Sequence, residues 1–311
     1  MLKNRPSHLQ AILQALFVTF LWSTSWVLIK IGLEEIPALP FAGLRYTLAF
    51  LCLLPFAARS GQLQSLRRVS GGTWARLLLL GLLFYSVTQG AQFLSLKYLP
   101  AVTVSLLLSF TTIPVGLIGV FALRERPAAI QWGGTALYLA GVVVYFYPLV
   151  LPRSELFGFA VAIVGVLANA LSSILGRHVN RSGELEPLAV TVVSMGFGGL
   201  LLLTGGIAAQ GLPRLTLTHW GIIPWLAVVN TAFAFTLWNH TLRTLSAMES
   251  SIINNTMLIQ IAVLAWLFLG EPLSWCMVLG MILAALGTLL VQIRRQPRTP
   301  RTGVPEAQEG Q

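Results

Sequence analysis

Residues 96–141 read LKYLPAVTVSLLLSFTTIPVGLIGVFALRERPAAIQWGGTALYLAG, and residues 242–287 repeat the pattern as LRTLSAMESSIINNTMLIQIAVLAWLFLGEPLSWCMVLGMILAALG. The two stretches align without a gap at a constant offset of 146 residues. Because leucines coincide by chance in apolar sequence, the evidence lies in the matched glutamates and glycines, which are Glu125 with Glu271, Gly134 with Gly280 and Gly141 with Gly287. The match indicates that the chain contains an internal repeat.

Hydrophobic residues dominate the chain around this repeat. Of 311 residues, 56% are hydrophobic and 10% are charged, and the mean hydropathy is +0.78. A soluble globular protein has about 25% charged residues, so this chain has too few charged side chains to cover a surface in water. Helices of roughly 20 apolar residues cross a bilayer. The composition therefore predicts a polytopic helical membrane protein and excludes a soluble enzyme. Ten spans are expected at 10–32, 39–58, 75–95, 99–122, 128–147, 156–176, 187–209, 219–240, 247–269 and 274–293.

The repeat divides these spans into two halves of five. An odd number of spans inverts the second copy in the membrane, and inverted repeats are typical of secondary transporters, which bind solutes near the midplane between the halves. The predicted fold class is an all-α polytopic membrane protein with ten transmembrane helices in two inverted five-helix repeats. The expected segments are a cytoplasmic tail at 1–9, repeats at 10–147 and 156–293, a connecting loop at 148–155, and a disordered basic, proline-rich cytoplasmic tail at 294–311.

The basic residues predict the orientation of the chain. Of the 20 Lys and Arg residues, fifteen lie on the side of the membrane that holds both termini, four lie on the opposite side, and Arg45 lies inside a span. Because loops rich in Lys and Arg stay in the cytoplasm, both termini are expected to be cytoplasmic, in a bacterial inner membrane. The basic residues that give the net charge of +10 are spread over the loops between the spans and are not gathered on one face. This distribution argues against a nucleic-acid partner.

Polar side chains inside the spans are candidates for the lining of a central substrate cavity. A side-chain amide in lipid needs a partner, so such residues should face the interior of the bundle. In the third span, polar residues recur at helical spacing on one face, at Tyr85, Thr88, Gln89 and Gln92. The other candidates are Trp22, Ser25, Trp26, Ser105, Ser109, Asn169, Ser172, Ser251, Asn254 and Asn255. The alternative role for these residues is to hold neighbouring helices together by hydrogen bonds.

Three charged residues each have two interpretations. Arg45 lies about seven residues, or ~10 Å, from the outer end of its span, where a charge must face protein or water. It is predicted either to contact a substrate carboxylate or to bond loop carbonyls or Glu34 and Glu35. Glu125 and Glu271 end counterpart helices, where they are predicted to cap or pair with neighbouring groups, with gating as the alternative.

Several of these motifs resemble the EamA domain of the drug/metabolite transporter superfamily. The matching residues are Leu21-Trp22-Ser23 with Lys30, Gly43-Leu44-Arg45-Tyr46, Ala91 with Leu96-Lys97-Tyr98 and Ala101, Pro114 with Leu123-Arg124-Glu125-Arg126, Leu245-Ser246-Ala247, and Leu269-Gly270-Glu271-Pro272. The resemblance covers roughly residues 10–293 and implies a ten-helix secondary transporter built from two five-helix halves. One position departs from the family pattern, because Gln260 stands where the ninth span usually carries a proline like Pro114.

The residues present also limit the chemistry. All ten acidic residues are glutamates at or beyond predicted helix ends, so no intramembrane carboxylate marks a proton relay. Glu249 and His240 are the nearest titratable candidates, and a solvated or capping role fits them better. We therefore expect facilitated or weakly coupled transport. No P-loop and no metal-ligand spacing of His and Cys occur in the sequence, so neither ATP hydrolysis, a cofactor nor a bound metal is predicted.

These observations favour a transporter over two other functions. The leading hypothesis is a non-ATP exporter of small metabolites, such as amino acids or their derivatives, that works by alternating access. A flippase for a lipid-linked sugar is the alternative, and an intramembrane enzyme is the third, for which the sequence offers no catalytic motif. The expected partners are a small-molecule substrate and the lipid bilayer. Glycines at seven-residue intervals predict close helix packing, either within the chain or in a homodimer.

Overall fold

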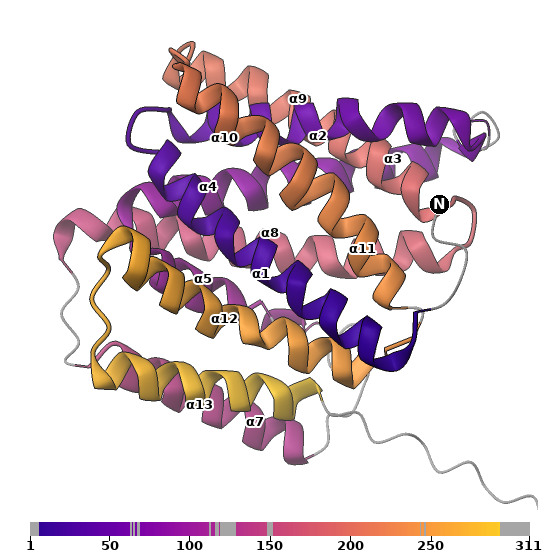
Figure 1. Cartoon of the computed structure of the whole chain (residues 1–311). Helices are drawn as coiled ribbons and strands as arrows, with labels where there is room; N and C mark the ends of the chain where they lie inside the picture. Colours follow the sequence, from indigo (N-terminus) through magenta and orange to yellow (C-terminus); the bar gives the residue numbers. More distant parts are fainter. Residues whose placement is uncertain are drawn as a thin grey trace, which may run out of the picture.

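The computed structural model describes residues 6–62, 64, 66, 69–111, 113–115, 118, 129–147, 152–242, 244–245 and 247–292. All regular secondary structure in these ranges is helical (Figure 1). The first half contains α1 (His8–Gly32), α2 (Ala38–Arg59), α3 (Gly71–Leu80), η2 (Gly81–Thr88), α4 (Gln89–Tyr98), α5 (Ala101–Ser109) and α7 (Ala129–Tyr145). The second half contains η3 (Arg153–Glu155), α8 (Leu156–Arg181), α9 (Pro187–Gln210), α10 (Leu217–Ala227), η4 (Val228–Phe233), α11 (Ala234–Thr241), α12 (Ala247–Leu269) and α13 (Trp275–Gln292).

Most of these helices are long and apolar enough to cross a bilayer. Within the described ranges, seven continuous helical segments meet this condition, and the shorter apolar helices α5, α7 and α13 accompany them. The prediction of a polytopic helical membrane protein is therefore confirmed. The C-terminal part of the predicted fourth span and the tail at 294–311 lie outside the described residues.

Two segments of π-helix interrupt otherwise α-helical spans. The segment η2 joins α3 to α4, and η4 joins α10 to α11. At the repeat offset of 146, residues 82–88 correspond to 228–234, so the two π segments occupy equivalent positions in the two halves. In both, a threonine hydroxyl donates to the carbonyl five residues earlier, from Thr88 to Leu83 O and from Thr231 to Leu226 O. Short π segments inside α-helices frequently occur at functional sites.

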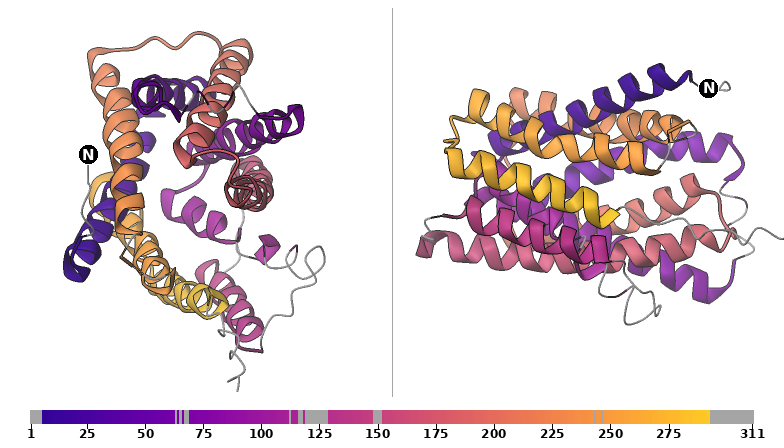
Figure 2. Two further views of the ribbon diagram at one scale, coloured as in Figure 1. Left: turned by 90° about the vertical axis from the view of Figure 1, so that its right-hand side faces the viewer. Right: turned by 90° about the horizontal axis from the view of Figure 1, so that it is seen from below.

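Equivalent helices of the two halves make equivalent packing contacts. The helix α2 packs along α9, and α7 packs along α13, so each of these pairs joins equivalent helices of the two halves (Figures 1 and 2). The helix α1 contacts α11 and α12, and its counterpart α8 contacts α4 and α5 in the same way. Likewise, η2 packs against α8 and α9, and η4 packs against α1 and α2.

Glycines bring α7 and α13 into backbone contact. A Cβ atom added at Gly134 would lie 2.7 Å from the carbonyl oxygen of Gly287, and one at Gly141 would lie 2.6 Å from the backbone nitrogen of Ala284. A Cβ at Gly280 would lie 2.5 Å from the nitrogen of Tyr145. The seven-residue glycine pattern is therefore used inside the chain, where the absence of side chains allows the two helices to approach closely.

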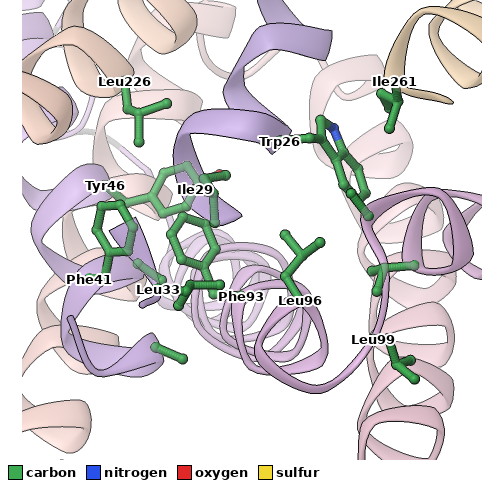
Figure 3. Close-up of a cluster of buried hydrophobic side chains, with 14 of the residues drawn as sticks. Trp26, Ile29, Leu33, Phe41, Tyr46, Phe93, Leu96, Leu99, Leu226 and Ile261 are labelled. Atoms are coloured by element: carbon green, nitrogen blue, oxygen red, sulfur yellow. The ribbon is translucent and has the colours of Figure 1, made fainter. Parts of the chain in front are cut away.

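The main apolar core lies beside the centre of the bundle. It contains Ile29 of α1, Phe41 and Tyr46 of α2, and Phe93 of α4, all less than a tenth exposed (Figure 3). The rings of Phe41 and Phe93 meet edge to face, with centroids 5.2 Å apart. This packing fixes the register of α2 against α4 and thereby positions Arg45, the residue next to Tyr46.

Candidate substrate cavity

A cavity of about 420 Å³ lies between the two halves. Its walls come from α1, α2, η2, α4 and α5 of the first half, and from α8, η4, α11, α12 and α13 of the second. Eleven residues that the sequence singled out line it, namely Trp22, Ser25, Trp26, Arg45, Gln89, Gln92, Ser105, Ser109, Asn169, Asn254 and Asn255. Their role in binding a solute is a prediction, but their convergence on one cavity is a property of the structure.

Equivalent positions of the two halves line this cavity. At the repeat offset, four pairs of lining residues correspond, which are Phe84 with Asn230, Gln89 with Phe235, Leu108 with Asn254, and Ser109 with Asn255. In each pair one member is an amide and the other is a side chain of different chemistry. The lining therefore repeats sequence positions between the halves without repeating their chemistry.

One wall of the cavity is aromatic. The Trp22 ring packs against Phe235 and Trp238 of α11, with ring centroids 5.2 Å apart in both cases. Trp26, one turn further along α1, also lines the cavity and is 8% exposed. The indole Nε1 of Trp22 is buried and has no hydrogen-bond partner in the part of the chain that the structure describes. This wall offers a flat apolar surface to the cavity.

Two amide side chains of the lining are held by specific contacts. Gln89 Oε1 accepts a hydrogen bond of 2.6 Å from the Tyr46 hydroxyl, and Asn169 Nδ2 donates to Thr111 Oγ1 at 3.1 Å. Ser109 donates to its own helix at Leu106 O. In contrast, Asn255 Nδ2 is buried and has no hydrogen-bond partner among the described residues. Buried polar groups are rarely left unpaired, and in this conformation neither this donor nor that of Trp22 is exposed to the cavity.

Arg45 brings a positive charge into the cavity wall. Its side chain is 6% exposed, and its Nε donates to Thr231 Oγ1 of η4 at 3.3 Å. Its guanidinium carbon lies 5.2 Å from the centre of the Tyr46 ring and 6.0 Å from that of Phe93. Among the described residues Arg45 makes no ion pair with Glu34 or Glu35, and Glu35 instead pairs with His219 of α10 at 3.3 Å. Arg45 is thus anchored by a hydroxyl and two rings.

Three predicted lining residues lie outside the cavity wall. Thr88 and Ser172 are buried and donate to their own helices, at Leu83 O and Asn169 O. Tyr85 is 7% exposed and packs against the Tyr46 ring at 5.6 Å. The prediction of one continuous polar face assumed an α-helical period through the third span. The π segment η2 changes that period between residues 81 and 88, so that Gln89 and Gln92 face the cavity and Tyr85 and Thr88 do not.

The sequence prediction also missed lining residues. Tyr46, Asn230 and Thr288 contribute polar groups to the cavity. Asn230 is fully buried, donates from Nδ2 to Leu21 O, and has no partner at Oδ1 among the described residues. It belongs to η4, where the α-helical period does not hold, so an α-helical pattern does not group it with other polar residues. At the repeat offset its counterpart is Phe84, which also lines the cavity.

Glu271 caps a helix at one end of the bundle. Its carboxylate accepts hydrogen bonds from the backbone nitrogens of Ala101 at 2.7 Å and Val102 at 3.4 Å. These are the first N–H groups of α5, which have no partner within the helix and carry its positive dipole end. Lys30 donates to the carbonyls of Leu96 and Leu99 at the end of α4, at 2.7 and 2.6 Å. Together Glu271 and Lys30 hold both sides of the α4–α5 turn.

Two other predicted residues fall outside the description. Glu125 lies in a segment that the structure does not describe, and the side chain of Ser251 is likewise not described. Their predicted roles, a cap or gate for Glu125 and cavity lining for Ser251, stay predictions.

Some polar residues inside the bundle connect helices. Gln260 of α12 donates to Thr256 Oγ1 at 3.0 Å and to Thr19 Oγ1 at 3.3 Å, and it accepts a bond of 3.0 Å from Ser23 of α1. The amide that replaces the usual proline therefore links α12 to α1. In the described part of the chain, no group of three metal-ligating side chains occurs.

The helical bundle and its central cavity define a class of protein, a multi-pass membrane protein that encloses a polar site between two sets of helices. A model of the EamA-like transporter family matches residues 9–147 and 156–293. The chain therefore belongs to the EamA-like transporter family, and the resemblance based on its motifs is confirmed.

Curated relatives are also transporters by name. The chain is 27% identical to the uncharacterized transporter YvbV of Bacillus subtilis over 302 residues, which cover 94% of each protein. It is 30% identical over 176 residues to a probable amino-acid metabolite efflux pump of Salmonella typhimurium, covering 56% of this chain and 48% of that protein. A crystal structure with 18% sequence identity superimposes with a TM-score of 0.64 and covers 93% of this chain, which shows the fold alone.

Proposed function

We propose that this chain is a secondary transporter that exports small metabolites, such as amino acids or their derivatives, by alternating access to the cavity between its halves. The observation that carries the proposal is the cavity lined by equivalent positions of both halves. Transporters with inverted repeats place their substrate site at such an interface. The Salmonella relative, a probable amino-acid metabolite efflux pump, supports this class of substrate.

The proposal includes the arrangement of the chain in the membrane. With α5, α7 and α13 counted as spans, each half has five spans and the second half is inverted relative to the first. Both termini then lie in the cytoplasm of a bacterial cell, as the distribution of Lys and Arg favours. The proposed energetics is facilitated or weakly coupled flux, because the cavity lining contains no carboxylate among the described residues.

A flux experiment tests the use of this cavity. Proteoliposomes are loaded with a mixture of amino acids and their derivatives, and the efflux of each compound is followed by mass spectrometry. Ser105 lines the cavity from α5, and a tryptophan at this position would occupy much of the space. We expect Ser105→Trp to reduce efflux of every transported compound to the level of empty liposomes.

The matched control places the same side chain on the lipid face. Leu171 of α8 is 48% exposed and lies on the outward face of the helix with Ile163 and Leu167, away from the cavity-lining Asn169. Leu171→Trp should therefore retain wild-type efflux. Wild-type efflux from Ser105→Trp, or equal loss in both variants, would contradict a pathway through the cavity.

A further inference from the structure

We infer that the solute is an organic anion whose carboxylate binds Arg45. The inference rests on the proposed function, because it assigns a class of substrate to the same cavity. The inference specifies a ligand without a free amino group. This preferred ligand carries one carboxylate and an apolar or aromatic body.

The first argument is the charge of the cavity. Arg45 is the one Lys, Arg or Glu residue in the described lining of the cavity. The chain contains no aspartate, and the described glutamates are all outside that lining, namely Glu34, Glu35, Glu155, Glu184, Glu186, Glu249 and Glu271. A charge inside a membrane span is costly and usually pairs with an opposite charge. Among the described residues Arg45 has no such partner, so a bound anion would supply it.

The second argument is the geometry of the guanidinium group. A guanidinium carries five N–H donors, and Thr231 accepts from the Nε atom of Arg45. The terminal nitrogens have no hydrogen-bond partner in the described part of the chain. The guanidinium carbon also lies 5.2 Å from the centre of the Tyr46 ring and 6.0 Å from that of Phe93, and these contacts hold the group in place. Such an anchored fork binds a carboxylate through two parallel hydrogen bonds.

The third argument is the lining beside Arg45. Trp22, Trp26 and Phe235 give the cavity an aromatic wall, which suits an apolar or aromatic body. Gln92 and Asn254 are neutral amides, and no side chain in the described lining is negatively charged. A ligand with a carboxylate and no ammonium group, such as an N-acylated amino acid, fits this lining. An ammonium group would find no carboxylate in it and would be repelled by Arg45.

Three ligands of nearly equal size test the charge directly. N-acetyl-L-phenylalanine is an anion at neutral pH, its carboxamide is neutral, and L-phenylalaninamide is a cation. Binding is measured as the shift in thermal stability of the purified protein in detergent, because a ligand of the folded state raises its stability. The acid should stabilise the wild type at a concentration about tenfold or more below that which the neutral amide requires, and the cation should have no effect.

Substitutions of Arg45 assign this preference to its side chain. Arg45→Gln should abolish the difference between the acid and the neutral amide, and Arg45→Lys should retain part of it, since lysine keeps the charge without the fork. Lys97 of α4 is exposed and outside the cavity lining, so Lys97→Gln should bind as the wild type does. Unfolding curves without ligand confirm that each variant is folded.

The outcomes separate this inference from the transport proposal. Equal stabilisation by acid and neutral amide, stabilisation by neither, or an unchanged preference in Arg45→Gln would contradict the role of Arg45. Another outcome is that wild-type proteoliposomes export only neutral or zwitterionic metabolites and that this efflux is lost in Ser105→Trp. In that case the transport proposal stands and the inference about Arg45 fails. If no metabolite crosses in wild-type proteoliposomes, the transport proposal itself fails.

Discussion

Leucine at Gly134 is expected to destabilise the protein strongly, whereas leucine at the adjacent Gly133 should not. Gly134 faces α13, where a Cβ atom would lie 2.7 Å from Gly287 O, Leu290 Cβ and Val291 N. Overpacking typically costs about 1–3 kcal/mol, and contact with backbone leaves no rotamer that relieves it. We expect a loss of at least that size in the free energy of unfolding, measured by thermal or denaturant unfolding in detergent.

The neighbouring glycine is the matched control. Gly133 is exposed, and a Cβ atom there would have no neighbour within 4 Å. Because glycine is a poor helix former, by about 1 kcal/mol relative to alanine, Gly133→Leu should be neutral or slightly stabilising. Equal effects of the two substitutions would show that α7 and α13 do not meet through Gly134. The same comparison can be made on α9, where Gly206 lies at the contact with α2 and Gly205 does not. Leucine should therefore destabilise the protein at Gly206 and not at Gly205.

Glu271→Ala is the second change with a large expected effect. It would leave the backbone N–H groups of Ala101 and Val102 without their acceptor and would remove the negative charge that interacts with Lys30. Each unsatisfied buried donor costs about 1–3 kcal/mol. We therefore expect a fall of several degrees in the unfolding temperature, with Glu271→Gln intermediate because its amide oxygen can still accept one bond.

The control for this cap is Glu186, which lies at the N-terminus of α9 and is exposed. Its side chain makes no capping hydrogen bond, so Glu186→Ala should change the unfolding temperature little. If Glu271→Ala is as stable as wild type, the cap at α5 does not contribute to the stability of the bundle.

Much of the fold could be predicted from the sequence, because membrane spans and repeats leave strong patterns. Apolar runs of bilayer length located most helices, and the spacing of Gly134 and Gly141 against Gly280 and Gly287 located a helix contact. Helix ends were less accurate: the third span extends over Gly71–Tyr98, beyond the predicted 75–95. Backbone and side-chain caps set these ends, and hydropathy does not detect them.

The candidate site was predictable where the α-helical period holds. In α1, Trp22, Ser25 and Trp26 were expected on one face and do line the cavity. In the third and eighth spans the π segments change the period, which displaced Tyr85 and Thr88 from the predicted face and concealed Asn230. The anchor of Arg45 could not be inferred either, because Thr231 is 186 residues away in sequence and no single-sequence pattern joins them.

The account depends most on the cavity opening alternately to the two sides of the membrane. Ser105 lines the cavity, so a variant with Cys52 and Cys276 replaced by alanine and Ser105→Cys introduced carries one thiol there. A membrane-impermeant maleimide is applied to right-side-out and to inside-out vesicles. A second variant with its cysteine at the C-terminus identifies the cytoplasmic side.

Our account predicts that the thiol at position 105 reacts in vesicles of both orientations, and that a transported solute slows both reactions. The C-terminal thiol should react in inside-out vesicles alone. Reaction of the thiol at position 105 from one side only, with transport intact, would contradict alternating access through this cavity.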